Sequence, residues 1–270
     1  MSIKVEHLSY TYPRSDEPVL RDLSFEAHEG KLTVVVGANG TGKSTLIKSI
    51  LGLNKASGSV MFDGIHRGSF TTKLMFSWIG YMTQESAMLT GLNVFNVVLL
   101  GRLGTLGIKV ADEDIRKVDD ILRLLELEQL AERPFYALSG GQRRLVDVAQ
   151  TLVKDPRILI MDEPTANLDL YNELQVLELV KAYTRQRGST TLVTLHDLNI
   201  AARYADRVIL LKDGMLFRDG SPKDVLTEEA IEAAYGVKAN VIIDEGGIPV
   251  VQTVSTAEAK HYDFGGISWK

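Results

Sequence analysis

Cysteine is missing from the 270-residue chain, and its absence removes two kinds of site. Without thiols the protein has neither disulfides nor thiolate metal sites, and this composition fits a reducing cytoplasm. Long apolar runs are also missing: the best candidate, 97–100, is far shorter than the roughly twenty residues that span a bilayer. The opening residues MSIKVEHLSY are polar and alternating, so we expect no secretory signal. We therefore expect any link to a membrane to run through a partner protein.

Excess positive charge, repeats and low-complexity tracts are absent from the sequence as well. The formal net charge is -5, so the overall charge does not favour a polyanion, and we expect no nucleic-acid partner. What the chain has is an ordinary globular composition, with 45% hydrophobic and 24% charged residues. Its length is sufficient for one large domain or two small ones with a buried core.

Stretches typical of strands and helices alternate along most of the chain. Residues 31–37, KLTVVVG, form a continuous β-branched run, which is typical of a strand buried on both faces. Residues 3–12 and 19–27 alternate apolar and polar side chains, as half-buried antiparallel strands do. Further strands are expected over 58–64, 77–84, 157–162 and 190–197, with hairpins over 208–220 and 239–254 and helices over 43–53, 170–183 and 228–236. This order predicts an α/β fold with a parallel sheet and an antiparallel patch at its start.

The block from Glu85 to Ala137 has a helical pattern instead. Its apolar residues follow helical spacing at Ile115, Val118, Ile121, Leu122 and Leu125. Asp112 is expected to cap this helix, and Pro134 is expected to break the region. We therefore predict a helical subdomain inserted in the α/β core.

The segment GANGTGKST, residues 37–45, matches the phosphate-loop pattern G-x-x-x-x-G-K-[ST]. Its glycines let the backbone wrap phosphate oxygens, Lys43 supplies a positive charge to the outer phosphates, and the Ser44 hydroxyl can hold Mg²⁺. A buried strand before the loop and a helix after it give the required context. We expect nucleotide contacts from Gly37, Ala38, Asn39, Gly40, Thr41, Gly42, Lys43, Ser44 and Thr45.

A second strand, within ILIMDEP at 158–164, ends in two carboxylates. Asp162 is expected at the carboxyl edge of the sheet, beside the phosphate loop, where it can bind Mg²⁺ through water. Glu163 follows it and could polarise an attacking water. The alternative is that Glu163 is a surface acid on a loop.

The segment ALSGGQRRLVDVAQ, residues 137–150, offers a second anion site. A Ser-Gly-Gly turn opens an amphipathic helix, so free backbone N–H groups and the helix dipole both point at the turn. Four weaker candidates are an amide and an imidazole at strand ends, an aromatic ring that could stack on adenine, and a carboxylate that on its own reads as a helix cap: Gln84, His196, Tyr12 and Asp169.

The order of these motifs along the chain resembles that of the ATP-binding cassette family, from the phosphate loop through Leu-Ser-Gly-Gly-Gln to the strand-borne Asp-Glu pair. The resemblance covers the chain to about residue 236. It implies a P-loop NTPase core over 2–236, an antiparallel N-terminal β subdomain, a helical subdomain at about 86–137, and a short C-terminal extension over 237–270. It also implies an ATPase that uses ATP and Mg²⁺.

On this resemblance two copies pair head to tail, and each copy's Ser139-Gly140-Gly141-Gln142 turn clamps the γ-phosphate held on the other's loop. Glu163 is implied as the general base and His196 as the residue that orients the water, with Lys43 completing the catalytic set. Asp169 is implied to cross the dimer interface. The chain departs from the common pattern at Thr83, Ala166, Asn167 and Arg144, where proline, serine, alanine and glutamine are frequent.

The resemblance also assigns Tyr12 to the adenine ring, and Gln84 to Mg²⁺ and to contact with a transmembrane permease. Mg²⁺ ligands are thus expected from Ser44, Gln84 and Asp162. The permease groove is expected in the helical block, near Met88, Leu89 and Val94, with these side chains exposed.

The segments NVFNVVLLGRL at 93–103 and LHDLNIAARYADRVILLKDG at 195–214 look like those of importers of iron–siderophore, haem and cobalamin. This subgroup implies a subunit on the cytoplasmic face of the membrane, held there by the permease and served indirectly by an extracytoplasmic substrate-binding protein. Two alternatives stay open: an exporter ATPase, and a soluble Fe–S assembly ATPase.

Overall fold

The computed structural model describes residues 1–84, 91–103 and 110–258, and its centre is a six-stranded sheet in the order β10-β9-β3-β8-β7-β6. Its strands are β3 (Leu32–Val36), β6 (Ile79–Met82), β7 (Ile158–Asp162), β8 (Thr190–Thr194), β9 (Arg207–Lys212) and β10 (Met215–Gly220). All are parallel except β10, which forms a hairpin with β9 through Asp213 and Gly214. Every residue of β3, β7 and β8 is buried, which confirms the predicted α/β fold.

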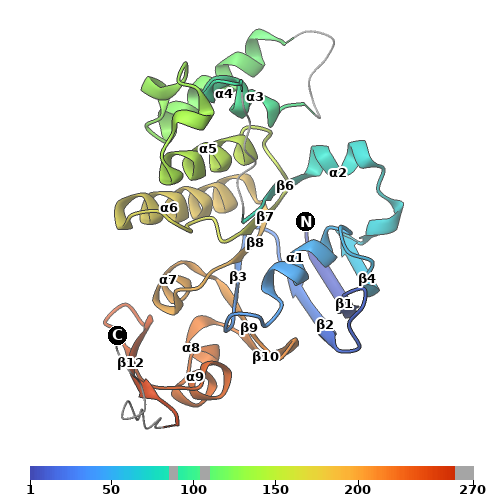
Figure 1. Cartoon of the computed structure of the whole chain (residues 1–270), viewed down its shortest axis with the longest axis vertical. Helices are drawn as coiled ribbons and strands as arrows, with labels where there is room; N and C mark the ends of the chain where they lie inside the picture. The colour runs from blue at the N-terminus through green and yellow to red at the C-terminus, as the bar shows by residue number, and fades with distance from the viewer. Residues whose placement is uncertain (85–90, 104–109, 259–270) are drawn as a thin grey trace, which may run out of the picture.

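A second, antiparallel sheet lies beside the first and has the order β2-β1-β4-β5 (Figure 1). Its strands are β1 (Ile3–Thr11), β2 (Pro18–Ala27), β4 (Ser57–Phe62) and β5 (Ile65–His66). Helix α1 (Lys43–Ile50) packs between the two sheets through Leu46, Ile47 and Ile50, in a cluster that also contains Val35 and Phe62. The predicted antiparallel N-terminal subdomain is therefore confirmed.

The predicted strand over 77–84 is wrong in its first two residues, because helix α2 (Thr72–Trp78) runs through them before β6 begins at Ile79. Thr71 caps this helix by accepting a hydrogen bond from the Leu74 N–H. Trp78 packs edge-on against Phe70, and Met75 and Trp78 pack against the core cluster that contains Ile158 of the sheet. Ser77 and Trp78 therefore belong to a helix and not to the strand.

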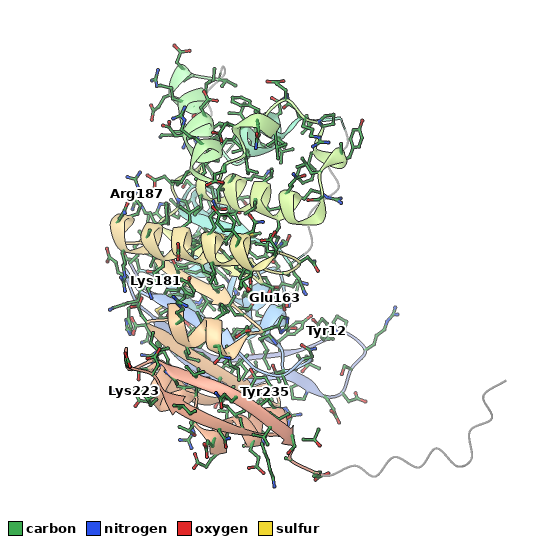
Figure 2. The ribbon with its side chains drawn as sticks, turned by 90° about the vertical axis from the view of Figure 1, so that its left-hand side faces the viewer. Tyr12, Glu163, Lys181, Arg187, Lys223 and Tyr235 are labelled. Atoms are coloured by element: carbon green, nitrogen blue, oxygen red, sulfur yellow. The ribbon has the colours of Figure 1, made fainter. Side chains whose placement is uncertain are left out.

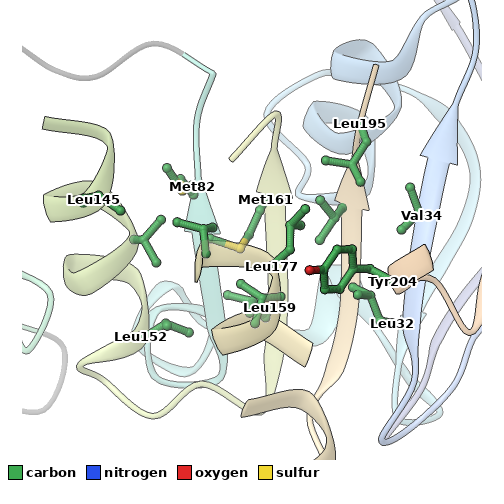
Figure 3. Packing of buried hydrophobic residues seen from close by; sticks show 14 of the residues in the cluster. Leu32, Val34, Met82, Leu145, Leu152, Leu159, Met161, Leu177, Leu195 and Tyr204 are labelled. Atoms are coloured by element: carbon green, nitrogen blue, oxygen red, sulfur yellow. The ribbon is translucent and has the colours of Figure 1, made fainter. Parts of the chain in front are cut away.

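Helices α3 (Val94–Leu100), α4 (Asp112–Leu124), α5 (Gly140–Leu152) and α6 (Leu170–Arg187) form the upper part of the molecule in Figure 1. Leu145 and Leu152 of α5 and Leu177 of α6 pack with Met82 and Met161 of the sheet (Figure 3). Helices α5 and α6, which follow the predicted subdomain of about 86–137, thereby pack against the main core.

Helix α3 of the predicted subdomain meets α5 at backbone distance. A Cβ atom at Gly101, just after α3, would lie 2.1 Å from the Gln150 carbonyl oxygen of α5. The Gln150 amide donates back to the Val97 carbonyl at 3.0 Å. Only glycine permits this approach.

The predicted cap of α4 is wrong: Ala111 is the N-cap residue, and Asp112 is the first residue of the helix. The carboxylate that closes the turn is Asp114, which accepts a hydrogen bond from the Ala111 N–H and pairs with the buried Arg102 at 2.8 Å. Asp114 was overlooked because its ion-pair partner lies across the gap between α3 and α4.

The C-terminal part comprises α7 (Leu198–Tyr204), α8 (Pro222–Val225), α9 (Glu228–Tyr235), β11 (Val237–Ile243) and β12 (Pro249–Thr256). Asn199 of α7 exchanges two hydrogen bonds with the Val251 main chain of β12, at 2.7 and 3.2 Å. The hairpin is therefore hydrogen-bonded to the helix that follows His196. The predicted boundary at 236/237 between an ATPase domain and a C-terminal extension stays a proposal. Short 3₁₀ turns lie at Arg67–Ser69, Glu128–Leu130 and Phe135–Ala137.

No helix within 1–84, 91–103 and 110–258 is both long and apolar enough to cross a membrane.

Candidate active site

The phosphate loop joins β3 to α1 and depends on a glycine at the start of the helix. Gly42 is the N-cap residue with φ +99°, and a Cβ there would lie 2.8 Å from the Leu20 side chain. Lys43 follows and is only 6% exposed. Its ammonium donates to the Gly37 and Ala38 carbonyls at 2.7 and 3.3 Å. Burial lowers the pKa of Lys43, while Glu163 and Asp162 oppose that shift.

A cavity of about 550 Å³ opens in front of this loop. The predicted nucleotide-binding side chains that line it come from the phosphate loop, from the first strand and from the ends of three others: Tyr12, Asn39, Gly40, Gly42, Lys43, Ser44, Thr45, Gln84, Glu163 and His196. Gly37, Ala38 and Thr41 belong to the loop without lining the cavity. The volume and the convergence of polar groups suit a phosphorylated ligand.

Tyr12 lies at the rim of the cavity. Its hydroxyl is 2.9 Å from the Thr45 hydroxyl, and its ring meets Tyr10 edge-on. The ring is 43% exposed, so one of its faces can receive a flat ligand. Figure 2 shows Tyr12 and Glu163 on the same side of the molecule.

Glu163 is the buried carboxylate of the cavity, 7% exposed. Its two oxygens have different partners: His196 Nε2 lies 2.5 Å from one, and the Gln84 amide donates to the other at 2.9 Å. Two side chains from separate loops thus meet the Glu163 carboxylate, and the alternative of a solvated surface acid is wrong. A carboxylate in this position can accept a proton from a water molecule at the loop. Gln84 and His196 each lie two residues beyond their strand ends, Met82 and Thr194.

Asp162, the last residue of β7, is 1% exposed and accepts a hydrogen bond from the Thr194 hydroxyl at 2.6 Å. The same hydroxyl accepts from the Glu163 N–H at 2.9 Å. Carboxylate, hydroxyl and amide oxygens are hard ligands, so Asp162, Ser44 and Gln84 are chemically suited to Mg²⁺. Thr194 was not predicted, and its only signal in the sequence is a hydroxyl residue within a buried strand.

The Ser139 turn caps α5 as predicted. Ser139 Oγ accepts from the Gln142 N–H at 3.2 Å, and the Gln142 side chain accepts from the Ser139 N–H at 3.1 Å. Ser139, Gly141, Gln142 and Asp169 line a separate cavity of about 500 Å³, with Gly140 next to them in the turn. Asp169 also caps α6 by accepting from the Asn172 N–H at 2.9 Å. One chain therefore presents the phosphate loop and the Ser139 turn to two different cavities.

The fold and the phosphate loop define the class: a P-loop nucleotide-binding protein in which the Lys43 loop and the Ser139 turn line different cavities. The family model described as ABC transporter matches residues 20–166. The chain belongs to the ABC transporter family, and it is one of the family's ATP-binding ATPases.

Two relatives and two solved structures are similar over most of the chain. The hemin import ATP-binding protein HmuV of Plesiomonas shigelloides is 36% identical, over 86% of this chain and 94% of that protein. The ferric enterobactin transport ATP-binding protein FepC of Escherichia coli is 34% identical, over 86% and 88%. An inward-facing metal-chelate type ABC transporter superposes with TM-score 0.78 at 27% identity, over 94% and 97%. A dimeric ATP-binding cassette bound to ADP and Pi superposes with TM-score 0.75 at 30% sequence identity, over 82% of this chain and 98% of that one.

We expect the Lys43→Ala substitution to weaken ATP binding by about 10- to 100-fold, because a charge-assisted hydrogen bond contributes about 1.5–3 kcal/mol. Folding should survive, since burial already works against the ammonium in the native protein. Isothermal titration with ATP and thermal unfolding measure the two quantities. Equal ATP affinity in the variant and the parent would contradict the phosphate-loop assignment.

Proposed function

We propose that the chain is the ATPase subunit of an importer for an iron chelate, of the siderophore, haem or cobalamin type. The names of HmuV and FepC and the metal-chelate type of the neighbouring transporter support the first two cargo types. In this proposal the subunit lies on the cytoplasmic face of the membrane, held by a permease, and an extracytoplasmic binding protein delivers the cargo to that permease.

The importer part of the proposal rests on the relatives named above. The observation that carries its ATPase part, a working pair of two copies, is the division of the site between two cavities. The Lys43 loop lines one cavity and the Ser139 turn lines another, so neither half alone surrounds a triphosphate. A second copy turned head to tail places the partner's Ser139 turn opposite the loop. The dimeric form of the neighbouring cassette supports this arrangement.

In the closed pair, the loop backbone and Lys43 hold the phosphates while Tyr12 packs on the base. Mg²⁺, when bound by Ser44, Gln84 and Asp162, would offset phosphate charge. Glu163 takes a proton from the water that attacks the γ-phosphorus, and the bond between that phosphorus and the ADP oxygen breaks. His196, already against Glu163, orients that water and the γ-phosphate.

The permease contact is proposed at a groove different from the one predicted. Val94 is fully buried, so that part of the prediction is wrong, because α3 packs into the core through Val94, Val97 and Val98. Met88 and Leu89 lie outside the described residues, and their exposure stays a prediction. An apolar groove of about 360 Å³ lies next to the Gln84 strand, lined by Leu51, Leu53, Phe70, Thr72, Met75, Ile79, Tyr81 and Lys154. A permease segment seated there would contact Tyr81, which precedes Gln84 by three residues in the sequence.

We expect Leu53→Glu to abolish co-purification of the permease and leave ATPase activity of the isolated subunit unchanged. Leu53 is 63% exposed, so a charge there disturbs an interface and not the core. Val254→Glu, at a residue 64% exposed on the C-terminal hairpin, is the matched control and should retain the permease. The measurement is affinity purification from membranes, with identification of the attached subunits.

The same purification tests the function itself. Recovery of the parent chain with a permease that transports iron chelates inward supports the proposal. Recovery with an exporter, or from a fraction free of membrane subunits, would identify one of the two alternatives instead.

A further inference from the structure

Arg144 lies on α5, five residues after the Ser139 cap, and is 3% exposed. It does not line the nucleotide cavity. Its side chain reaches instead into the junction between α5 and the ends of β6 and β7. A buried guanidinium needs many partners, and this one finds them entirely on the main chain.

Five hydrogen bonds join the guanidinium to five main-chain carbonyls, two in the segment after β6 and three at the end of β7. Nη1 donates to Thr83 at 2.7 Å and Gln84 at 3.0 Å, Nη2 donates to Asp162 at 2.8 Å and to Glu163, and Nε donates to Pro164 at 3.2 Å. A guanidinium has five N–H groups, so these contacts use its full donor capacity. Lysine and glutamine cannot reproduce this planar fan of donors.

The five carbonyls belong to the two loops that carry Gln84 and Glu163. These loops are 79 residues apart in sequence, and their side chains meet in the Gln84–Glu163 hydrogen bond. Arg144 donates to the main-chain carbonyls of the same two residues. The two loops are therefore held together by their side chains and, through Arg144, by their main chains.

The backbone of Glu163 gives this grip a specific purpose. Its φ is +51°, in the left-handed region that non-glycine residues rarely adopt. Such a conformation persists where surrounding contacts hold it. Two hold it here: the Thr194 hydroxyl accepts a hydrogen bond from the Glu163 N–H, and the Arg144 guanidinium donates one to the Glu163 carbonyl.

Charge also favours the arrangement. Burial lowers the pKa of Arg144, whereas Asp147, Asp162 and Glu163 raise it and thereby favour the charged form. The cation also lies close enough to Glu163 to offset part of the cost of burying that carboxylate.

We infer that Arg144 is a positioning residue for hydrolysis, which holds the Glu163 backbone in its left-handed conformation and keeps Gln84 against the Glu163 carboxylate. The inference rests on the proposed role of Glu163 as general base. It gives a purpose to a position where this chain departs from the glutamine common in the family.

The test compares Arg144→Gln, Arg144→Lys and Arg144→Met with the parent, using the full chain. We expect single-turnover hydrolysis to fall by about 10- to 100-fold, while ATP affinity changes less than about threefold, because Arg144 does not line the cavity. Arg102→Gln is the control, since Arg102 is also buried but pairs with Asp114, away from the cavity. It should lower stability without lowering the rate per folded molecule.

A second arm separates positioning from general support of the fold. In a Glu163→Gln background the Arg144 substitutions should cause no further loss of residual rate, because the group they position is already gone. A full additional loss there, an unchanged rate in a folded Arg144 variant, or failure of all three variants to fold would overturn the inference. If Glu163→Gln alone hydrolyses at the parent rate, the proposed base is wrong, and this outcome is distinct from a failure at Arg144.

Discussion

The Glu163→Gln substitution should stop hydrolysis and leave a stable ATP-bound dimer. General-base assistance accelerates a reaction by about 100- to 10,000-fold, and an amide cannot take the proton. The loss of negative charge beside the γ-phosphate also favours the closed pair. On size-exclusion chromatography the variant should therefore elute as a dimer in Mg-ATP and as a monomer without nucleotide.

The structure adds a detail to this expectation. The Gln84 amide donates to the Glu163 carboxylate, whereas the amide of the variant has a single oxygen, so the Gln84 amide must rotate if that oxygen faces His196 instead. The contact with His196 Nε2 can persist, since an amide oxygen accepts as a carboxylate does. A variant that stays monomeric in saturating Mg-ATP, or hydrolyses like the parent, would exclude Glu163 as the base.

The Ser139→Arg substitution should have an equally large effect on hydrolysis without touching the chain's own phosphate loop. Ser139 lines a different cavity from Lys43, so ATP binding by each monomer should stay near the parent value. A bulky cation at the turn would block closure against the partner's nucleotide, and the steady-state rate should fall to background. The measurements are nucleotide titration and phosphate release on the same sample.

A matched control removes the simpler explanation that a helix cap was lost. Thr71 caps α2 as Ser139 caps α5, through a hydrogen bond from the third helical N–H. Thr71→Arg should lower stability by about 1 kcal/mol and leave hydrolysis intact. Normal hydrolysis by the purified Ser139→Arg variant would refute the divided site.

Most of the fold could be predicted because its signals are local. The run Leu32–Val36 is apolar on both faces, as a central parallel strand requires, and the Asp213-Gly214 pair turns the hairpin between β9 and β10 as expected. Helix α2 was not predicted, and the strand expected over 77–84 overlaps its last two residues, because its apolar residues run directly into those of β6. A boundary without Gly or Pro leaves no mark in the sequence.

Side chains that line the cavity could also be named in advance, the phosphate loop by its own pattern and Tyr12, Gln84 and His196 through the family resemblance, because each of these three alone is a weak signal. What the sequence does not contain is how they are held. Thr194 joins Asp162 to the Glu163 N–H across two strands, and Arg144 joins two loops to a helix. These contacts depend on tertiary geometry, which no spacing along the chain encodes.

The contact between Gly101 and Gln150 couples the position of α3 closely to that of α5. Gly101 contributes no side chain, so its backbone lies against the Gln150 carbonyl of α5, and the Gln150 side chain ties α5 to Val97 of α3. We therefore expect a displacement of α3 to move α5, the helix that begins at the Ser139 cap. Movement of one helix would thus change the position of the turn that lines the second cavity.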